Sequence, residues 1–417
     1  MEFSFALSRE LFSSAGIDTG TTLLLKVFSE ELDRGLLQEL QNRKGPLHIL
    51  DAGSGCGVIG ICAARALEGI DVRANSTDRD ELAGIFTGYN ARQNGLESEK
   101  FSVHTSTLFN GDRDRDLILS NIPAKAGKPV LEDFIRRACP HSEALAFIVA
   151  VKTLADFTRS TIADAGAEIL RETAGPGHTV FVFRRGGTAS GPGGGFRQNR
   201  FAEDQARSNT VSEEETFLSV YRRQRFETEL EGCALGMDTF HGAPGFGDPG
   251  AALLAAVKLS CRLGLNTEKF RADRLFHETE QGCYPLWFYK SLGTEKTQNG
   301  KAILSGRNVL SLKAAEYNLK NTVSTALVTA ADLVSAGDAL LGEGPYGFIA
   351  ALPENMPRES IPSHWEVLTL LLQPQGVFLV SLPSFLAEQF DRAKISGFIR
   401  LGNLRRGGFR ALAYRKA

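Results

Sequence analysis

A glycine-rich run, Gly186–Gly195, constrains this chain more than any other feature, because it divides the sequence into two parts that must fold separately. Glycine pays a high entropic cost in helices and strands, and the run has no side chain large enough to pack. The polar stretch that follows extends it, so we expect a flexible linker over residues 186–212. We therefore predict one domain over residues 1–185 and a second over residues 213–417, since 417 residues exceed one ordinary core.

Strand-like and helix-like patterns alternate through the first domain. This alternation predicts an α/β fold with a doubly wound, Rossmann-like sheet flanked by helices. Residues 167–170 and 180–183 are joined by Gly175-Pro176-Gly177 and predict a closing antiparallel hairpin. The expected strands are residues 48–50, 72–77, 116–120, 146–151 and 179–183, and the expected helices are residues 58–67 and 81–93.

The segment Asp51–Gly57 (DAGSGCG) leaves the first expected strand and enters the first expected helix. Its glycines can adopt positive φ and let a ligand approach the backbone, as in sites for dinucleotides or S-adenosylmethionine (SAM). Two acidic residues favour SAM. Asp51 ends the first strand, and Asp78 ends the second, where a carboxylate can accept hydrogen bonds from both ribose hydroxyls. Asp80 is the competing candidate for the second role.

The sequence Ser120-Asn121-Ile122-Pro123 ends a strand of the buried type. The side-chain oxygen of Asn121 and the main-chain carbonyl of Ile122 can both accept hydrogen bonds from an exocyclic NH2 group and orient its nitrogen lone pair. No strong base is required, because the proton can leave after the transfer. The alternative is a strand end followed by an ordinary proline turn.

The second domain repeats the pattern of the first, which predicts a tandem duplication. Four pairs of segments match in the same order along the chain: residues 12–20 with 240–250, the helix ending at Asn90 with the helix ending at Asn318, residues 116–127 with 346–357, and residues 146–151 with 377–382.

The second copy departs from the first where chemistry would take place. Residues 284–293 contain no equivalent of the glycine turn. Counting back twelve residues from the paired asparagines places Gly306 opposite Asp78, and the gapless alignment places Ala351 opposite Asn121. We therefore expect a degenerate second domain that keeps the fold without the cofactor site.

Three motifs in this order give the first domain a more specific likeness. They are residues 12–25, which include Asp18-Thr19-Gly20-Thr21, residues 49–60 around the glycine turn, and Asn121–Lys128. Residues 3–185 thereby resemble the RsmC/RlmG family of rRNA guanine-N2 methyltransferases and its small archaeal relatives. The duplicated architecture also resembles that family, although there the C-terminal domain is the active one, so the order here is reversed.

The resemblance implies a class I methyltransferase fold with a seven-stranded mixed sheet, SAM as the cofactor and an exocyclic guanine amine as the acceptor. It also implies that Asn121, Ile122 and Pro123 form the catalytic motif that grips the target amine. The implied cofactor-binding residues are Asp18, Gly20, Thr21, Asp51, Gly53, Gly55, Gly57, Asp78, Thr107 and Asn121.

Two positions depart from the family pattern. The family has Asn-Pro-Pro-aromatic at the reactive motif, whereas this chain has Ile122 and Ala124. Stacking on a flipped base, worth about 1–3 kcal/mol, must then come from elsewhere. Thr107 stands where an acidic residue often meets the adenine amino group. Both departures weaken the case for a nucleobase substrate.

Charge restricts where RNA could bind. A net charge of −2 and a pI near 6.4 give nucleic-acid binding no general support, so an rRNA or ribosomal-subunit partner depends on local basic patches. Lys125 and Lys128, beside the reactive motif, are the best-placed substrate-binding candidates. The other basic groups are Arg136-Arg137, Arg197 with Arg200, and Arg222-Arg223 with Arg225.

The sequence contains no apolar run long enough for a membrane span, no signal-peptide pattern, and no CxxC spacing among its six cysteines. We therefore expect a cytoplasmic protein with no membrane segment and no metal site. The leading interpretation is a SAM-dependent N-methyltransferase of rRNA guanine. The alternatives are methyl transfer to a protein amide or small molecule, and a non-catalytic SAM- or RNA-binding module, which Ile122 and Ala124 would favour.

Overall fold

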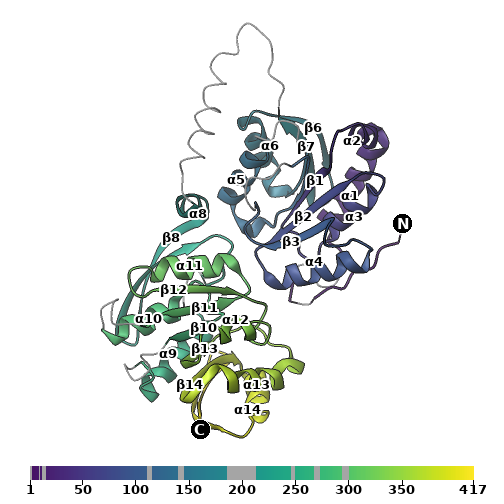
Figure 1. Cartoon of the computed structure of the whole chain (residues 1–417). Helices are drawn as coiled ribbons and strands as arrows, with labels where there is room; N and C mark the ends of the chain where they lie inside the picture. Colours follow the sequence, from purple (N-terminus) through teal and green to yellow (C-terminus); the bar gives the residue numbers. More distant parts are fainter. Residues whose placement is uncertain are drawn as a thin grey trace. The chain divides into compact units, whose positions relative to one another are not determined.

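The computed structural model describes residues 2–8, 10–11, 16–109, 115–139, 145–185, 213–245, 249–266, 273–293 and 300–417. The chain forms two compact units: the N-terminal unit, Met1–Arg79 with Ala83–Arg222, and the C-terminal unit, Asp80–Leu82 with Arg223–Ala417 (Figure 1). The predicted linker, residues 186–212, lies outside the described residues. Helix α8 (Glu213–Tyr221) groups with the N-terminal unit, although the sequence assigned its residues to the second domain.

The N-terminal unit is built on a seven-stranded sheet with the strand order β3-β2-β1-β4-β5-β7-β6. Strand β7 runs antiparallel to β5 and β6, and the other neighbours are parallel. The predicted mixed α/β sheet with a closing hairpin is therefore confirmed. The strands are β1 (Leu47–Ala52), β2 (Val72–Asp78), β3 (Phe101–Thr105), β4 (Leu117–Asn121), β5 (Leu145–Val151), β6 (Ala167–Ala174) and β7 (His178–Arg185).

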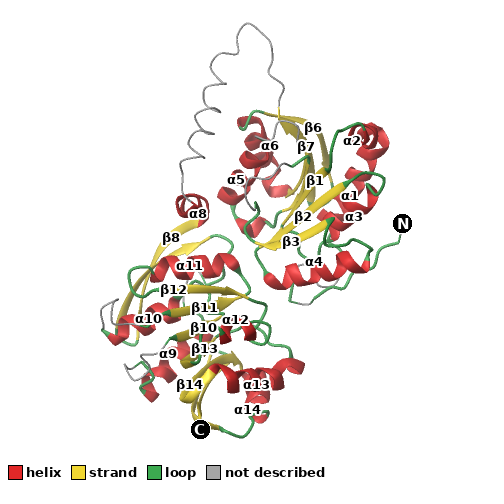
Figure 2. Ribbon diagram, in the orientation of Figure 1, coloured by secondary structure: helices red, strands yellow, loops and turns green. Residues whose placement is uncertain are grey.

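Helices lie on both faces of this sheet (Figure 2). On one face, Leu24 and Ile59 from two helices pack with Leu119 and Phe147 of the central strands, because alternate strand residues point to the same side. The helices of the unit are α1 (Thr19–Glu31), α2 (Leu37–Gln41), α3 (Val58–Ala66), α4 (Glu81–Gln93), α5 (Lys128–Ala138), α6 (Ala155–Asp164) and α8.

The C-terminal unit repeats this architecture. Its seven-stranded sheet has the order β12-β11-β10-β13-β14-β16-β15, which is the same order in chain sequence as in the first sheet. The predicted duplication of the fold is therefore confirmed. Its strands are β10 (Arg274–His277), β11 (Ala302–Gly306), β12 (Thr325–Thr329), β13 (Tyr346–Ala351), β14 (Leu372–Pro383), β15 (Phe398–Arg406) and β16 (Phe409–Lys416), preceded by the ribbon of β8 (Arg222–Leu230) and β9 (Cys233–Phe240).

The helices of the C-terminal unit bury a large aromatic core. Both tryptophans of the chain, Trp287 and Trp365, have no exposed surface. The helices are α9 (Ala251–Leu263), α10 (Cys283–Leu292), α11 (Val309–Leu319), α12 (Gly337–Leu341), α13 (Ile361–Leu371) and α14 (Ser384–Arg392). No helix in the described parts of the chain is long and apolar enough to cross a membrane.

Candidate functional site

The glycine turn follows β1 at the carboxyl edge of the sheet. Gly53, Gly55 and Gly57 have φ values of 75°, 55° and 82°, which lie in the left-handed region that favours glycine. The Gly53 amide donates to the Thr77 carbonyl at 2.8 Å, which fixes the turn against the end of β2. A Cβ atom on Gly57 would lie 2.8 Å from Thr87 Cγ2, so this position has no room for a side chain. A Cβ atom on Gly55 would meet nothing within 4 Å, so the backbone there is open.

Asp78 ends β2 directly beside this turn. Its Oδ2 atom accepts a hydrogen bond from the Gly55 amide at 2.9 Å. Asp80, the competing candidate, instead accepts from the Leu82 amide at 3.0 Å at the start of α4. The geometry thus brings Asp78, and not Asp80, to the glycine turn.

Asp51 lies beneath the turn and is only 1% exposed. Its Oδ2 atom accepts from the Gly60 amide at 2.9 Å in the first turn of α3. Burial raises the pKa of Asp51 to about 7, and the Asp78 carboxylate adds to the effect. The Asp51 side chain therefore stabilises the junction between the glycine turn and α3.

Asn121, at the end of β4, is held by the beginning of α1. Its Nδ2 atom donates to both carboxylate oxygens of Asp18, at 3.2 and 3.1 Å, and to Thr21 Oγ1 at 3.1 Å. Asp18 is the N-cap of α1 and accepts from the Gly20 amide at 2.7 Å and the Thr21 hydroxyl at 2.7 Å. A Cβ atom on Gly20 would lie 3.2 Å from Asn121 Nδ2, so glycine allows the helix start to approach the strand end.

These contacts fix the orientation of the Asn121 amide. Burial alone would raise the pKa of Asp18, but hydrogen bonds from Thr21, Gly20 and Asn121 lower it below the ordinary value. The ionised carboxylate can only accept, so it selects the NH2 end of the amide. Within the described residues, all hydrogen bonds of this side chain are made by Nδ2, and Oδ1 remains available as an acceptor.

The predicted reactive motif continues with Ile122 and Pro123, whose side chains carry no polar group. The Ile122 side chain is buried and Pro123 is exposed. Lys125 is exposed in a short 3₁₀ turn (Ala124–Ala126). Lys128 begins α5 with its Nζ atom 5.2 Å from the centre of the Phe157 ring. Lys125 and Lys128 are therefore both exposed and follow closely after Asn121 in the chain.

Thr107 lies in the loop after β3, the strand that neighbours β2 in the sheet. The Ser106 amide donates to the Asp78 carbonyl at 2.8 Å, and the Leu108 carbonyl accepts from Thr77 Oγ1 at 2.9 Å. Thr107 is thus held close to the end of β2.

Among the other predicted basic groups, Arg136 and Arg137 are less suited to bind a polyanion. Arg136 pairs with Glu132 at 2.9 Å and Arg137 pairs with Asp133 at 3.1 Å, each four residues apart on α5. Arg197 and Arg200 lie outside the described residues. The arginines of α5 therefore have carboxylate partners within their own helix.

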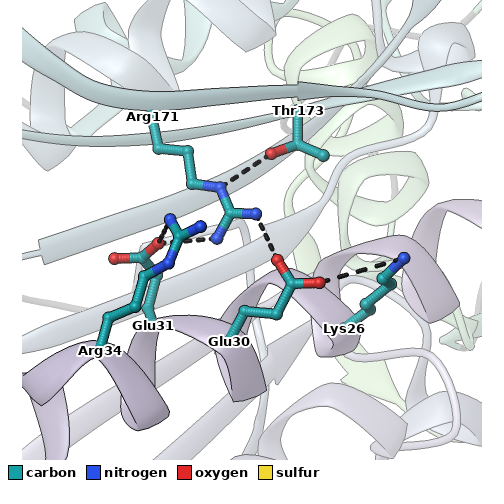
Figure 3. A network of polar contacts seen from close by, with 6 residues as sticks. All are labelled: Lys26, Glu30, Glu31, Arg34, Arg171 and Thr173. Carbon is teal, nitrogen blue, oxygen red and sulfur yellow. Dashed lines mark hydrogen bonds and ion pairs between the residues drawn. The ribbon is translucent and has the colours of Figure 1, made fainter.

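A polar network joins α1 to the edge of the sheet and so fixes the helix that carries Asp18 (Figure 3). Arg171 of β6 contacts Glu30, donates to Glu31 at 2.7 Å, and donates to Thr173 at 3.1 Å. On the helix itself, Lys26 lies 4.0 Å from Glu30 and Arg34 lies 3.2 Å from Glu31. The sequence did not reveal this network, because its partners are separated by about 140 residues.

The C-terminal unit has an equivalent of the glycine turn, which corrects the sequence prediction. Gly282 precedes α10 with φ 88° and ψ 17°, matching Gly57 before α3 with φ 82° and ψ 9°. Counting back from this pair places Glu278 and Glu280 at the positions of Gly53 and Gly55. The turn therefore lies at residues 278–282, immediately before residues 284–293, which the sequence pattern had placed opposite it.

The alignment of β4 with β13 also changes. In the N-terminal sheet Ala52 pairs with Ser120, and in the C-terminal sheet the equivalent His277 pairs with Ala351. Ala351 thus corresponds to Ser120, and Leu352 corresponds to Asn121. The gapless alignment was wrong by one residue, which in a strand exchanges the two faces. His277 of β10 pairs with Ser305 of β11, as Ala52 of β1 pairs with Thr77 of β2. The residues that follow, Gly306 and Asp78, therefore occupy equivalent positions, as the sequence predicted.

The start of α9 gives a third correction. Its N-cap is Gly250, which has no side chain, whereas the N-cap of α1 is Asp18. The sequence had placed Asp248 opposite Asp18, and Asp248 lies outside the described residues. At the N-cap position itself, the described part of the C-terminal unit thus has no side chain in the place of Asp18.

Comparisons with known proteins show what the chain is similar to in sequence and in fold. Residues 2–154 match the family model of the methyltransferase small domain. The chain is 31% identical over 147 residues to "Uncharacterized protein YbxB" of Bacillus subtilis (strain 168), a match that covers 34% of this chain and 65% of that protein, which is just under two thirds of its length.

One solved structure resembles the whole two-unit chain. It is the T. thermophilus 16S rRNA N2 G1207 methyltransferase (RsmC) in complex with AdoMet and guanosine, with a TM-score of 0.59 and 16% identity, covering 99% of this chain and 95% of that one. Residues 2–154 of the N-terminal unit are therefore similar to the methyltransferase small domain, and the likeness of the complete chain to RsmC is one of fold.

Proposed function

We propose that the protein is a SAM-dependent N-methyltransferase whose active site lies in the N-terminal unit and whose acceptor is an exocyclic amino group of guanine in rRNA. The single observation that carries this proposal is the contact of Asn121 with Asp18. It fixes an amide with its oxygen available at the carboxyl end of β4, on the edge that also carries the glycine turn and Asp78.

The order of these groups along the edge fits the cofactor. The sheet order β3-β2-β1-β4 sets Thr107, Asp78, the glycine turn and Asn121 side by side, at spacings of about 4.8 Å between strands. In SAM the adenine is followed by the ribose and then by the sulfonium, which carries both the methionine chain and the transferable methyl group. Asp78 would accept from the ribose hydroxyls, and the open backbone at Gly55 would leave room for the ligand.

The residues would act chiefly by orientation. Bound SAM supplies an electrophilic methyl group on its sulfonium. Asn121 Oδ1 and the Ile122 carbonyl would accept the two hydrogens of the target amine and direct the nitrogen lone pair toward that methyl group. Asp18, kept ionised by its lowered pKa, would prevent the Asn121 amide from flipping. The proton can leave the amine after transfer, so the mechanism needs no strong base.

The acceptor is inferred from the family resemblance, from the fold shared with RsmC, and from the two exposed lysines that follow Asn121. Lys125 and Lys128 would bind phosphates beside the target nucleotide. The absence of an aromatic residue at position 124 keeps a protein amide or a small molecule as competing acceptors.

The test follows labelled methyl transfer from SAM into ribosomal subunits, protein pools and metabolite pools. We expect label in rRNA, and label only in protein or metabolites would reject the RNA acceptor. Asn121→Ala should reduce transfer by at least about 100-fold while SAM affinity changes by no more than a few-fold, because orientation and not cofactor binding is lost. Asn42→Ala, at an exposed helix end, is the matched control. SAM binding without transfer to any cell extract would favour a non-catalytic module.

A further inference from the structure

Helix α8 contributes aromatic side chains to the N-terminal unit from beyond the predicted linker. It packs against α5, and its inner face consists of Phe217, Val220 and Tyr221, which are 7–8% exposed. The rings of Phe217 and Tyr221 are stacked at 5.6 Å with 27° between their planes. The helix is therefore seated by a well-packed apolar face and not by a single contact.

Tyr221 reaches the loop that follows β3. Its hydroxyl makes a hydrogen bond with the side chain of Thr107, and the charges of Arg79 and Asp133 act on it. Arg79 comes directly after Asp78, and the amide of Ser106 donates to the Asp78 carbonyl at 2.8 Å. The phenol thus lies past Asp78 on the side away from Asn121, at the β3 end of the edge. Burial raises the pKa of Tyr221 to about 12, so the hydroxyl stays protonated at neutral pH.

We propose that Phe217 and Tyr221 of α8 form the outer wall of the adenine end of the cofactor pocket, so that a segment beyond the linker completes the site. This inference rests on the proposed function, because the adenine position follows from the ribose at Asp78. The Tyr221 ring would pack against the purine. The hydroxyls of Tyr221 and Thr107 would form hydrogen bonds with the adenine amino group, because Thr107 stands at the position where the related family often has an acidic residue. Tyr221 is in this sense a specificity-determining residue for the cofactor.

A wall next to the adenine amino group should exclude cofactors enlarged at that nitrogen. We would measure by calorimetry the binding of S-adenosylhomocysteine and of its N6-benzyl derivative to the full-length protein. The wild type should bind the parent compound and bind the benzyl derivative at least about tenfold more weakly, because a packed wall does not yield to an added ring. Tyr221→Ala should create a hole and improve binding of the benzyl derivative at least about tenfold over the wild type.

Two variants control for general damage to the fold. Tyr221→Phe keeps the ring and should still exclude the benzyl derivative. Stronger binding of that derivative is expected only in Tyr221→Ala, where the ring is removed. Tyr89→Ala, on the exposed face of α4, should leave the affinities for both compounds unchanged. Because the expected result is a gain of binding, an unfolded variant cannot imitate it.

The outcomes separate the two proposals. If the wild type binds S-adenosylhomocysteine but admits the benzyl derivative, or if Tyr221→Ala does not admit it better, the wall is rejected and the proposed function stands. If Tyr221→Ala binds the parent compound more tightly than the wild type, the ring occupies the adenine position itself, and the wall is again rejected. If the wild type binds neither compound, both proposals are rejected together.

Discussion

Both units carry the same turn at the carboxyl edge of their own, equivalent sheet. Only in the N-terminal unit do two glycines leave the backbone of this turn uncovered by side chains. Gly53 and Gly55 have φ values of 75° and 55°, and their counterparts Glu278 and Glu280 both have φ 51°. Left-handed backbone is unfavourable for a side chain with a Cβ atom, so the C-terminal unit keeps the turn at a cost in conformational energy. The left-handed backbone of the turn is thus kept with or without glycine at these two positions, whereas Gly57 and its counterpart Gly282 are kept in both units because a Cβ atom on either would lie 2.8 Å from a neighbouring residue.

The glutamates fill the space that a cofactor would need. Glu278 Oε1 accepts a hydrogen bond from the Arg307 amide at 2.6 Å. The cavity that remains among Glu278, Glu280 and Gly306 leaves room for about one water molecule. Gly306 replaces Asp78, and the carboxylate next to this position comes from Glu278 of the turn itself, whose Oε1 atom would lie 3.1 Å from a Cβ atom on Gly306. We therefore expect no SAM binding by the C-terminal unit.

The largest effect should come from copying the closed turn into the open one. Gly55→Glu should lower the affinity of the N-terminal unit for SAM by at least about 100-fold, because the side chain brings bulk and a second negative charge next to Asp78. The fold should survive, since Glu280 adopts the equivalent conformation at φ 51°. Calorimetry for SAM and circular dichroism for folding would measure the two effects.

The reverse substitution sharpens this test. Glu280→Gly should not create SAM binding in the C-terminal unit, because Gly306 and Leu352 still stand where the N-terminal unit has Asp78 and Asn121. Retained SAM affinity in Gly55→Glu would mean that the ligand does not approach this turn, and the comparison between an open and a closed site would fail.

The sequence predicted the scaffold of this comparison well. Strands β4 and β5 of the N-terminal sheet contain continuous apolar runs, a pattern typical of strands that are buried on both faces of a sheet. Strand β3 (Phe101–Thr105) was missed because its serine, histidine and threonine side chains suit a partly exposed edge strand and give no apolar run. Helices α5 and α6 were also not predicted, although the strands that follow each of them were.

The relation between the two sites could not be read from sequence alone. The alignment of Asn121 with Ala351 was wrong because strands β4 (LILSN) and β13 (YGFIAA) each contain a run of apolar residues, so that a shift by one residue changes the sequence similarity little. Only the pairing with β1 and β10 fixes the register. The role of Asp18 was also hidden, because its partner Asn121 is 103 residues away along the chain.

Glu278 should make the stability of the C-terminal unit depend on pH. Burial raises its pKa from 4.5 to about 7, so the folded state binds a proton more tightly than the unfolded state. The stability from this group is fully present below the unfolded pKa and is lost as pH rises through the folded pKa. Glu278→Gln should therefore stabilise the unit at pH 8 by up to about 3 kcal/mol relative to the wild type, and by much less at pH 4.5.

The two tryptophans allow this to be measured in one unit only. Trp287 and Trp365 both lie in the core of the C-terminal unit, so their fluorescence during urea unfolding reports on that unit. Glu227→Gln, whose side chain is 79% exposed, is the control and should show no such pH dependence. If Glu278→Gln and the wild type run parallel from pH 4.5 to pH 8, the glutamate is not buried in the closed turn as described.

The smallest expected effect concerns what the two units share. Asn90 donates to the Cys56 carbonyl at 2.9 Å, and Asn318 donates to the Gln281 carbonyl at 3.0 Å, so each amide fastens its helix to the residue before the last glycine of the turn. Each alanine variant should lower the free energy of unfolding of its own unit by about 1–3 kcal/mol, because a buried carbonyl loses its donor. Circular dichroism would follow Asn90→Ala and tryptophan fluorescence would follow Asn318→Ala. Only Asn90→Ala should also weaken SAM binding, since only its turn would hold a ligand. A similar loss of SAM affinity in Asn318→Ala would show that the closed unit takes part in cofactor binding, contrary to the division of the two sites.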